Sequence, residues 1–156
     1  MPPESKRRRS MNDASPEHNT RAITLLHIVL CGGLATIGVA FLLVMKRLGG
    51  PLLRGAESAR SLVGYVTLAI ALALLAGAIM FIRARLRPRP QHQSLEAYWA
   101  LEQTRGAAMA LWVVCDMAGI IAAVGYILSG WLPALAGTLL AFAVLVAYRP
   151  SSLTGA

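Results

Sequence analysis

Asp116 is the residue whose type and position most strongly suggest chemistry, because it stands near the middle of an otherwise apolar run, residues 107–128. A carboxylate at the centre of a bilayer costs at least about 2.5 kcal/mol, so an acidic residue in a membrane span indicates a functional site by default. Small side chains share its side of the predicted helix at positions Cys115, Gly119, Ala122 and Ala123. Another helix can approach such a face closely, so we expect Asp116 to face protein. The structural alternative is a protonated carboxyl group that hydrogen-bonds a neighbouring helix.

His27 is the second candidate, one turn inside the first apolar run. If the first and third runs are neighbouring helices, His27 and Asp116 differ in depth by about 7 Å, at 1.5 Å per residue. A proton relay between His27 and Asp116 is therefore the sharper hypothesis. The alternative is an interfacial histidine solvated from the cytoplasm. His27 is the one histidine in any apolar run, so the axial pair that membrane haem proteins need is lacking.

The two cysteines, Cys31 and Cys115, fall at nearly the same depth and form no CxxC pair. Apolar burial disfavours the reactive thiolate, so both are interpreted as small packing residues. The sequence also lacks a Walker loop and the HExxH, GxSxG and dinucleotide-binding motifs. We therefore predict no enzymatic activity, no cofactor and no metal site.

The elements that position these residues follow from composition. Of 156 residues, 56% are hydrophobic and 14% are charged, and the mean hydropathy is +0.59, which excludes an ordinary soluble domain. About 20 apolar residues cross a bilayer as a helix. Four runs approach this length, at 23–45, 61–82, 107–128 and 132–148. They predict an all-α integral membrane protein whose transmembrane domain, residues 23–148, has four helices in two hairpins.

The connections between these runs differ in character. Residues 46–60 form a loop containing glycines and a proline, whereas residues 129–131 form a tight turn between the third and fourth helices. Within residues 83–106, Pro88 and Pro90 are expected to end the second helix. Ser94 then caps a short helix, which we expect to lie at the membrane interface and to lead into the third span.

The charge distribution predicts orientation. The net charge is +8, and basic residues occur mainly between apolar runs, which indicates topology signals and argues against nucleic acid as a partner. With the N-terminus inside, eleven Lys and Arg residues lie in the cytoplasm and four lie outside, in residues 46–60. We expect a bacterial inner-membrane protein with both termini cytoplasmic.

The ends of the chain are expected to lie outside the bundle. A basic, polar and disordered extension is predicted for residues 1–22, with Met11 as an alternative start, and a short tail for residues 149–156. A cleaved signal peptide is the competing interpretation of the N-terminus. The first apolar run has 23 residues and exceeds the usual length of a signal core, which favours a retained helix.

Three further sets of residues are predicted to mediate contacts. Small residues spaced for close helix packing are Gly32, Thr36, Ala40, Ala69, Ala73, Gly77, Gly119, Ala123, Gly137 and Ala141. Arginines expected to bind anionic lipid head groups are Arg83, Arg85, Arg87 and Arg89. Aromatic anchors expected at the membrane interfaces are Tyr98, Trp99, Tyr126, Trp131 and Tyr148.

Two functions are compatible with this pattern. The chain resembles the small multidrug resistance transporters in size and number of spans, but that family carries its essential carboxylate in the first helix, where this chain has none. We therefore expect a protein that acts through helix–helix contacts, as an accessory or assembly subunit of a membrane complex or as a homo-oligomer. Its partners would be the lipid bilayer, anionic lipids and other membrane subunits or itself. The alternative is a small proton-coupled transporter or ion pathway with Asp116 as the protonatable group.

Overall fold

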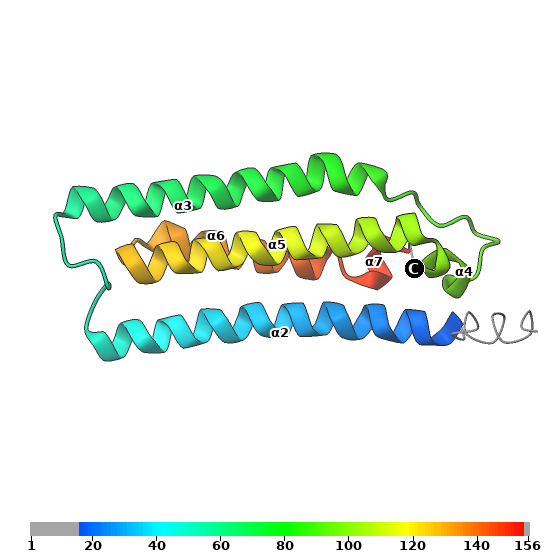
Figure 1. Cartoon of the computed structure of the whole chain (residues 1–156), viewed down its shortest axis with the longest axis horizontal. Coiled ribbons are helices and arrows are strands. Elements are labelled where there is room, and N and C mark those ends of the chain that lie inside the picture. The colour runs from blue at the N-terminus through cyan, green and yellow to red at the C-terminus, as the bar shows by residue number, and fades with distance from the viewer. Residues whose placement is uncertain (1–15, 155–156) are drawn as a thin grey trace, which may run out of the picture.

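The computed structural model describes residues 16–154, which fold into helices and contain no strand (Figure 1). In chain order the elements are α2 (Pro16–Leu48), α3 (Glu57–Gly77), the π-helical turn η1 (Ala78–Ile82), the 3-10 turn η2 (Arg83–Arg85), α4 (Leu95–Ala100), α5 (Glu102–Ser129), α6 (Leu132–Ala147) and α7 (Pro150–Leu153). The predicted all-α class is confirmed.

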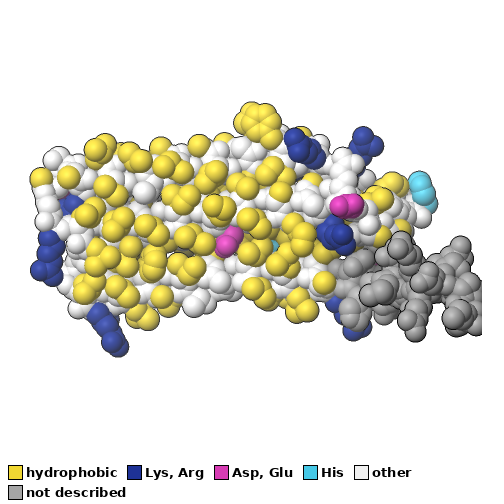
Figure 2. Space-filling view, in the orientation of Figure 1, with side chains coloured by type: hydrophobic (Ala, Val, Ile, Leu, Met, Phe, Trp, Pro, Cys, Tyr) yellow, Lys and Arg dark blue, Asp and Glu magenta, His cyan; other side chains and the backbone are white. Residues whose placement is uncertain are grey.

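Three helical segments are long and apolar enough to cross a membrane: Thr20–Leu48, Glu57–Arg85 and Glu102–Ser129. The helix α6 is apolar but has 16 residues, which span about 24 Å against a hydrocarbon core of about 30 Å. The structure therefore supports a multi-pass membrane protein with three long spans, and the fourth span stays a prediction. Figure 2 shows hydrophobic side chains over the middle of the molecule and basic side chains toward its ends.

The central element of the bundle is α5, which packs against α2, α3 and α6. Half of its most apolar stretch is buried inside the protein, against 6% for α2 and 17% for α3. The tight turn between α5 and α6 forms as expected, since Gly130 adopts a left-handed conformation (φ 71°) that ends α5. These two helices form the predicted second hairpin.

The predicted first hairpin is wrong, because α5 lies between α2 and α3 (Figure 1). The reason is the path of the loop after α2. Its backbone amides at Leu52 and Leu53 donate to the carbonyl oxygens of Ile127 and Leu128, both at 3.1 Å. The loop therefore crosses the end of α5 before α3 begins.

The segment before α5 also differs from the expectation of a continuous lead-in. Ser94 caps α4 as predicted, since its hydroxyl oxygen accepts the Ala97 amide at 3.1 Å. However, Leu101 adopts an extended conformation (ψ 115°), which separates α4 from α5. This break lets α4 pack against α2, so Tyr98 and Trp99 are buried in the protein at 2% and 1% exposure. Their predicted role as interface anchors is therefore wrong.

The two ends of the chain hold more helix than expected. Residues 16–22 belong to α2, because a proline at the first helical position loses no hydrogen bond. The rest of the predicted extension, residues 1–15, lies outside the described residues. In the predicted tail, α7 packs back against α2 and residues 155–156 are outside the described part.

Candidate functional site

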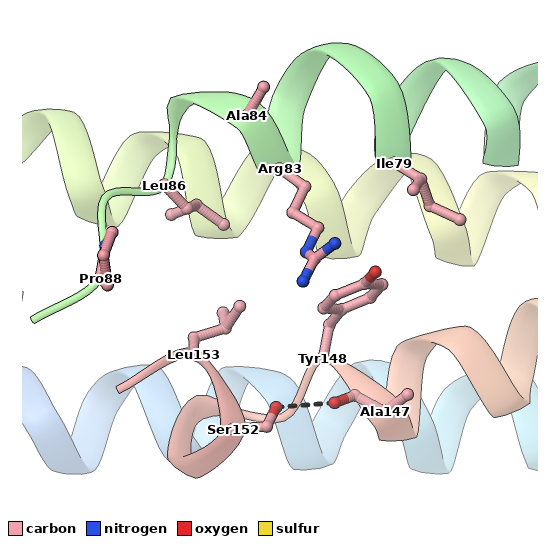
Figure 3. A pocket seen from close by; sticks show the side chains of 9 residues that line it. All are labelled: Ile79, Arg83, Ala84, Leu86, Pro88, Ala147, Tyr148, Ser152 and Leu153. Atoms are coloured by element: carbon pink, nitrogen blue, oxygen red, sulfur yellow. Dashed lines mark hydrogen bonds between the residues drawn. The ribbon is translucent and has the colours of Figure 1, made fainter. Parts of the chain in front are cut away.

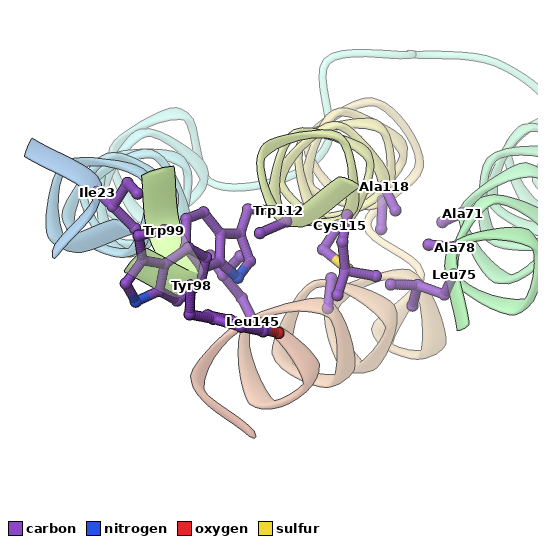
Figure 4. Packing of buried hydrophobic residues seen from close by; sticks show 14 residues of the cluster. Ile23, Ala71, Leu75, Ala78, Tyr98, Trp99, Trp112, Cys115, Ala118 and Leu145 are labelled. Atoms are coloured by element: carbon purple, nitrogen blue, oxygen red, sulfur yellow. The ribbon is translucent and has the colours of Figure 1, made fainter. Parts of the chain in front are cut away.

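The candidate site lies where α2, α5 and α6 meet, next to an aromatic cluster (Figure 4). Trp112 in α5 is fully buried, and its ring centroid lies 5.0 Å from that of His27 and 6.4 Å from that of Trp99. Tyr98 continues the cluster, with its ring edge against Trp99. The cluster fills the end of the bundle at which α2 begins and α6 ends.

His27 is buried at 7% exposure, so a histidine solvated at the interface is the wrong interpretation. Its Nε2 lies 3.0 Å from the carbonyl oxygen of Leu145. Because a carbonyl only accepts, Nε2 must carry the proton and donate it. A helix leaves its last carbonyl groups without a hydrogen-bond partner, and His27 donates to one of these groups at the end of α6.

Two other side chains donate hydrogen bonds to carbonyl groups at the same end of α6. The indole Nε1 of Trp112 donates to the Tyr148 carbonyl oxygen at 2.7 Å, and the Ser152 hydroxyl donates to that of Ala147 at 2.6 Å. These bonds stabilise the end of α6, because they give partners to carbonyl groups that the helix itself leaves unpaired. A structural role for His27 follows from this geometry.

Asp116 remains the unexplained group. Its Oδ1 atom is buried and has no hydrogen-bond partner in the described part of the chain. The small residues expected on its side of α5 are buried, with Cys115 and Ala122 at 0% and Ala123 at 1% exposure, and Gly119 is buried as well. Asp116 is itself half-buried, so it lies at the border between this packed face and the surface of the bundle.

Cys31 lies one helical turn after His27 in α2 and contacts its ring. Its Sγ is 3.8 Å from Nε2 and 3.9 Å from Nδ1 of His27. The Nε2–H group of His27 donates to the Leu145 carbonyl oxygen and not to Asp116. Among the described residues, no three His, Cys, Asp or Glu side chains are arranged to hold a metal ion.

The predicted packing residues divide into two groups. In α5 and α6 they lie at helix crossings: a Cβ at Gly119 would meet Leu34 at 2.7 Å, and one at Gly137 would meet Leu68 at 2.8 Å. Ala123 and Ala141 are buried at 1% and 0% exposure. In α2 and α3 the predicted residues face away from the other helices: a Cβ added at Gly32 or at Gly77 would meet nothing within 4 Å, although Gly77 itself is half-buried. Thr36, Ala40, Ala69 and Ala73 are exposed there.

Sequence reasoning missed two glycines that position α3. A Cβ at Gly64 would meet the ring of Trp131 at 2.9 Å, and a Cβ at Gly125 would collide with Thr67. Both positions therefore require glycine for close approach. Gly125 lies three residues after Ala122, so the buried small-residue face of α5 could have indicated it.

The four arginines predicted to bind head groups do not form one surface. Arg83 lines a cavity beside Tyr148, whereas Arg85 and Arg87 line a separate cavity beside Tyr98 and Glu102. The remaining member, Arg89, is half-buried. The segment changes direction because Leu86 is extended (ψ 104°) after the 3-10 turn.

The other predicted interface anchors lie at the two ends of the bundle and are half-buried. Trp131 packs against Tyr65 with ring centroids 4.2 Å apart, and Tyr148 stacks under the guanidinium of Arg83. Tyr126 is also half-buried, near the end of α5.

Comparisons with known proteins do not assign this chain to a family, because no protein-family model, curated protein or solved structure matches it.

Proposed function

We propose that this protein is a non-enzymatic, multi-pass membrane protein that works through helix–helix contacts, as an accessory or assembly subunit or as a homo-oligomer. The observation that carries the proposal is the outward position of the small-residue faces of α2 and α3. We place the protein in a bacterial inner membrane with both termini in the cytoplasm, on the basis of its charge distribution.

The face of α2 is defined by Gly32, Thr36 and Ala40, which we call the α2 stripe. With 100° per residue, the α2 stripe lies opposite the buried residues His27 and Leu34. The Thr36 hydroxyl donates to the Gly32 carbonyl at 2.7 Å, so its polar group is satisfied within the helix. The stripe is therefore a smooth, apolar surface that another helix can approach closely.

The small residues of α5 and α6 lie at helix contacts within the protein, in contrast to those of α2 and α3. Where α5 and α6 cross their neighbours, Gly119, Gly125 and Gly137 each leave no room for a Cβ without displacing a side chain. This protein thus uses small residues for close helix contacts. On α2 and α3, the described chain supplies no helix to cover the equivalent faces.

The experiment compares Gly32→Leu with Ala35→Leu by native mass spectrometry after extraction in mild detergent. Ala35 is also exposed but lies beside α6, in a groove with Leu139 and Phe142. Overpacking a close contact costs about 1–3 kcal/mol, so Gly32→Leu should weaken a complex about tenfold, and Ala35→Leu should not. A wild-type protein that is purely monomeric, without a stoichiometric partner, would contradict the proposal.

A second candidate function is a proton-coupled pathway, which the buried and unpartnered Oδ1 of Asp116 favours. Four helices alone scarcely enclose a pathway, so this function also requires a dimer. Asp116→Asn should then abolish pH-dependent transport in proteoliposomes while leaving the helical content unchanged. Full retention of transport would exclude Asp116 as the coupling group.

A further inference from the structure

A cavity of about 620 Å³ lies between the end of α3 and the corner that joins α6 to α7 (Figure 3). Its apolar walls include Ile79, Leu86 and Leu153, and its polar groups include Arg83, Tyr148 and Ser152. Of the described residues that line it, none is acidic. The cavity therefore combines an unneutralised cation with apolar walls.

The position of Arg83 depends on an irregular backbone. The π-helical turn η1 and the 3-10 turn η2 follow the regular helix α3, and Arg83 begins the 3-10 turn. A π-helical turn inserts an extra residue and so rotates the side chains that follow it; such turns often occur at functional sites. Figure 3 shows the guanidinium of Arg83 directed across the cavity toward Tyr148.

Tyr148 holds this guanidinium in place. The central carbon of the Arg83 guanidinium lies 5.3 Å from the centroid of the Tyr148 ring, within the range of a cation–π interaction. The backbone of Tyr148 is fixed in turn, because its carbonyl accepts the indole proton of the buried Trp112. Since a stacked guanidinium keeps its N–H donors at the edge of its plane, it can still bind a phosphate bidentately.

We propose that this cavity binds the phosphate of one anionic phospholipid, with Arg83 as the phosphate ligand and the apolar walls against the start of the acyl chains. The site lies at the end of a membrane-spanning helix, where head groups are found. The apolar walls favour a lipid over free phosphate, which would leave those walls uncovered. This inference does not depend on the proposed role in helix contacts.

The test uses native mass spectrometry of the full chain, titrated with phosphatidylglycerol and, separately, with phosphatidylcholine. Wild-type protein should retain one phosphatidylglycerol more tightly than phosphatidylcholine. Arg83→Gln should weaken that binding about fivefold, as expected for one basic residue at a lipid surface. The matched control is Arg85→Gln, which removes the same charge two residues away and outside this cavity.

Three results would overturn the proposal. Equal weakening by Arg83→Gln and Arg85→Gln would indicate general attraction to anionic lipid. Competition by millimolar inorganic phosphate would indicate a simple anion site, and equal retention of both lipids would remove the role of charge. If Arg83→Gln does not fold, Tyr148→Leu tests the same site, because it removes the ring that positions the guanidinium, and unchanged selectivity in that variant would also overturn the proposal.

Discussion

At the scale of single residues, the structure reassigns the polar groups that the sequence singled out. His27 was a candidate relay residue only because of its expected depth in the membrane. In the structure its Nε2–H group donates to the Leu145 carbonyl of α6. Depth can be predicted from position along a helix, whereas a hydrogen-bond partner 118 residues away depends on packing. Asp116 remains a candidate functional residue, because its buried Oδ1 has no hydrogen-bond partner among the described residues.

Tyr98 offers a test at this scale, since its phenol is buried and donates to the Arg87 carbonyl at 2.9 Å. Burial raises the pKa of Tyr98 above its ordinary value of 10.0. The folded state therefore favours the neutral phenol, and this contribution is complete below about pH 10 and is lost as the pH rises through the raised pKa.

We expect Tyr98→Phe to lower the free energy of unfolding by about 1 kcal/mol at pH 8, because the hydrogen bond to the Arg87 carbonyl is lost. The variant should also lose less stability than wild type between pH 9 and 11. Thermal unfolding in detergent at several pH values measures both effects. Parallel pH dependence in the two proteins would show that Tyr98 does not titrate with unfolding.

At the scale of elements, the sequence predicts where helices run better than which faces they bury. The three long helices, the turn at Gly130 and the cap at Ser94 all follow from local signals. The spacing of Gly32, Thr36 and Ala40 shows that they share a face, but not which neighbour the face meets. That depends on the loop after α2, which crosses to α5 through hydrogen bonds that no local pattern encodes.

Gly125 and Gly32 form a matched pair for testing helix packing. A side chain at Gly125 would collide with Thr67 and push α3 away from α5, so Gly125→Ala should destabilise the protein by about 1–3 kcal/mol. Gly32 has open space around it, so Gly32→Ala should be neutral or stabilise the monomer by up to about 1 kcal/mol through helix propensity. Thermal unfolding of the two variants in detergent distinguishes them, and equal stability would argue against the α3–α5 crossing.

At the scale of the whole molecule, the described chain begins and ends at the same end of the bundle (Figure 1). The start of α3, which holds Ser58, and the segment between η2 and α4, which holds His92, lie at opposite ends. Four alternating apolar runs predict that the ends of the chain lie together, although the sequence paired the first two helices incorrectly, and the side that faces the cytoplasm stays a prediction from the distribution of Lys and Arg. Sidedness depends on loop charge, whereas pairing depends on tertiary contacts.

Labelling with a membrane-impermeant maleimide tests the arrangement in intact cells. Ser58→Cys should react from outside, whereas His92→Cys should react only after the cells are opened. The wild-type protein is the control, because Cys115 is buried and Cys31 is partly buried. Labelling of both variants from outside would contradict the proposed orientation.

The short helix α6 has a consequence for the membrane itself. It falls about 6 Å short of the hydrocarbon thickness that α2, α3 and α5 can cross. A bilayer next to such a helix thins locally, at a cost of fractions of a kcal/mol per ångström of mismatch. The crossing of the membrane by α6 is a prediction, and if α6 does cross it, longer acyl chains should strain the corner between α6 and α7 first.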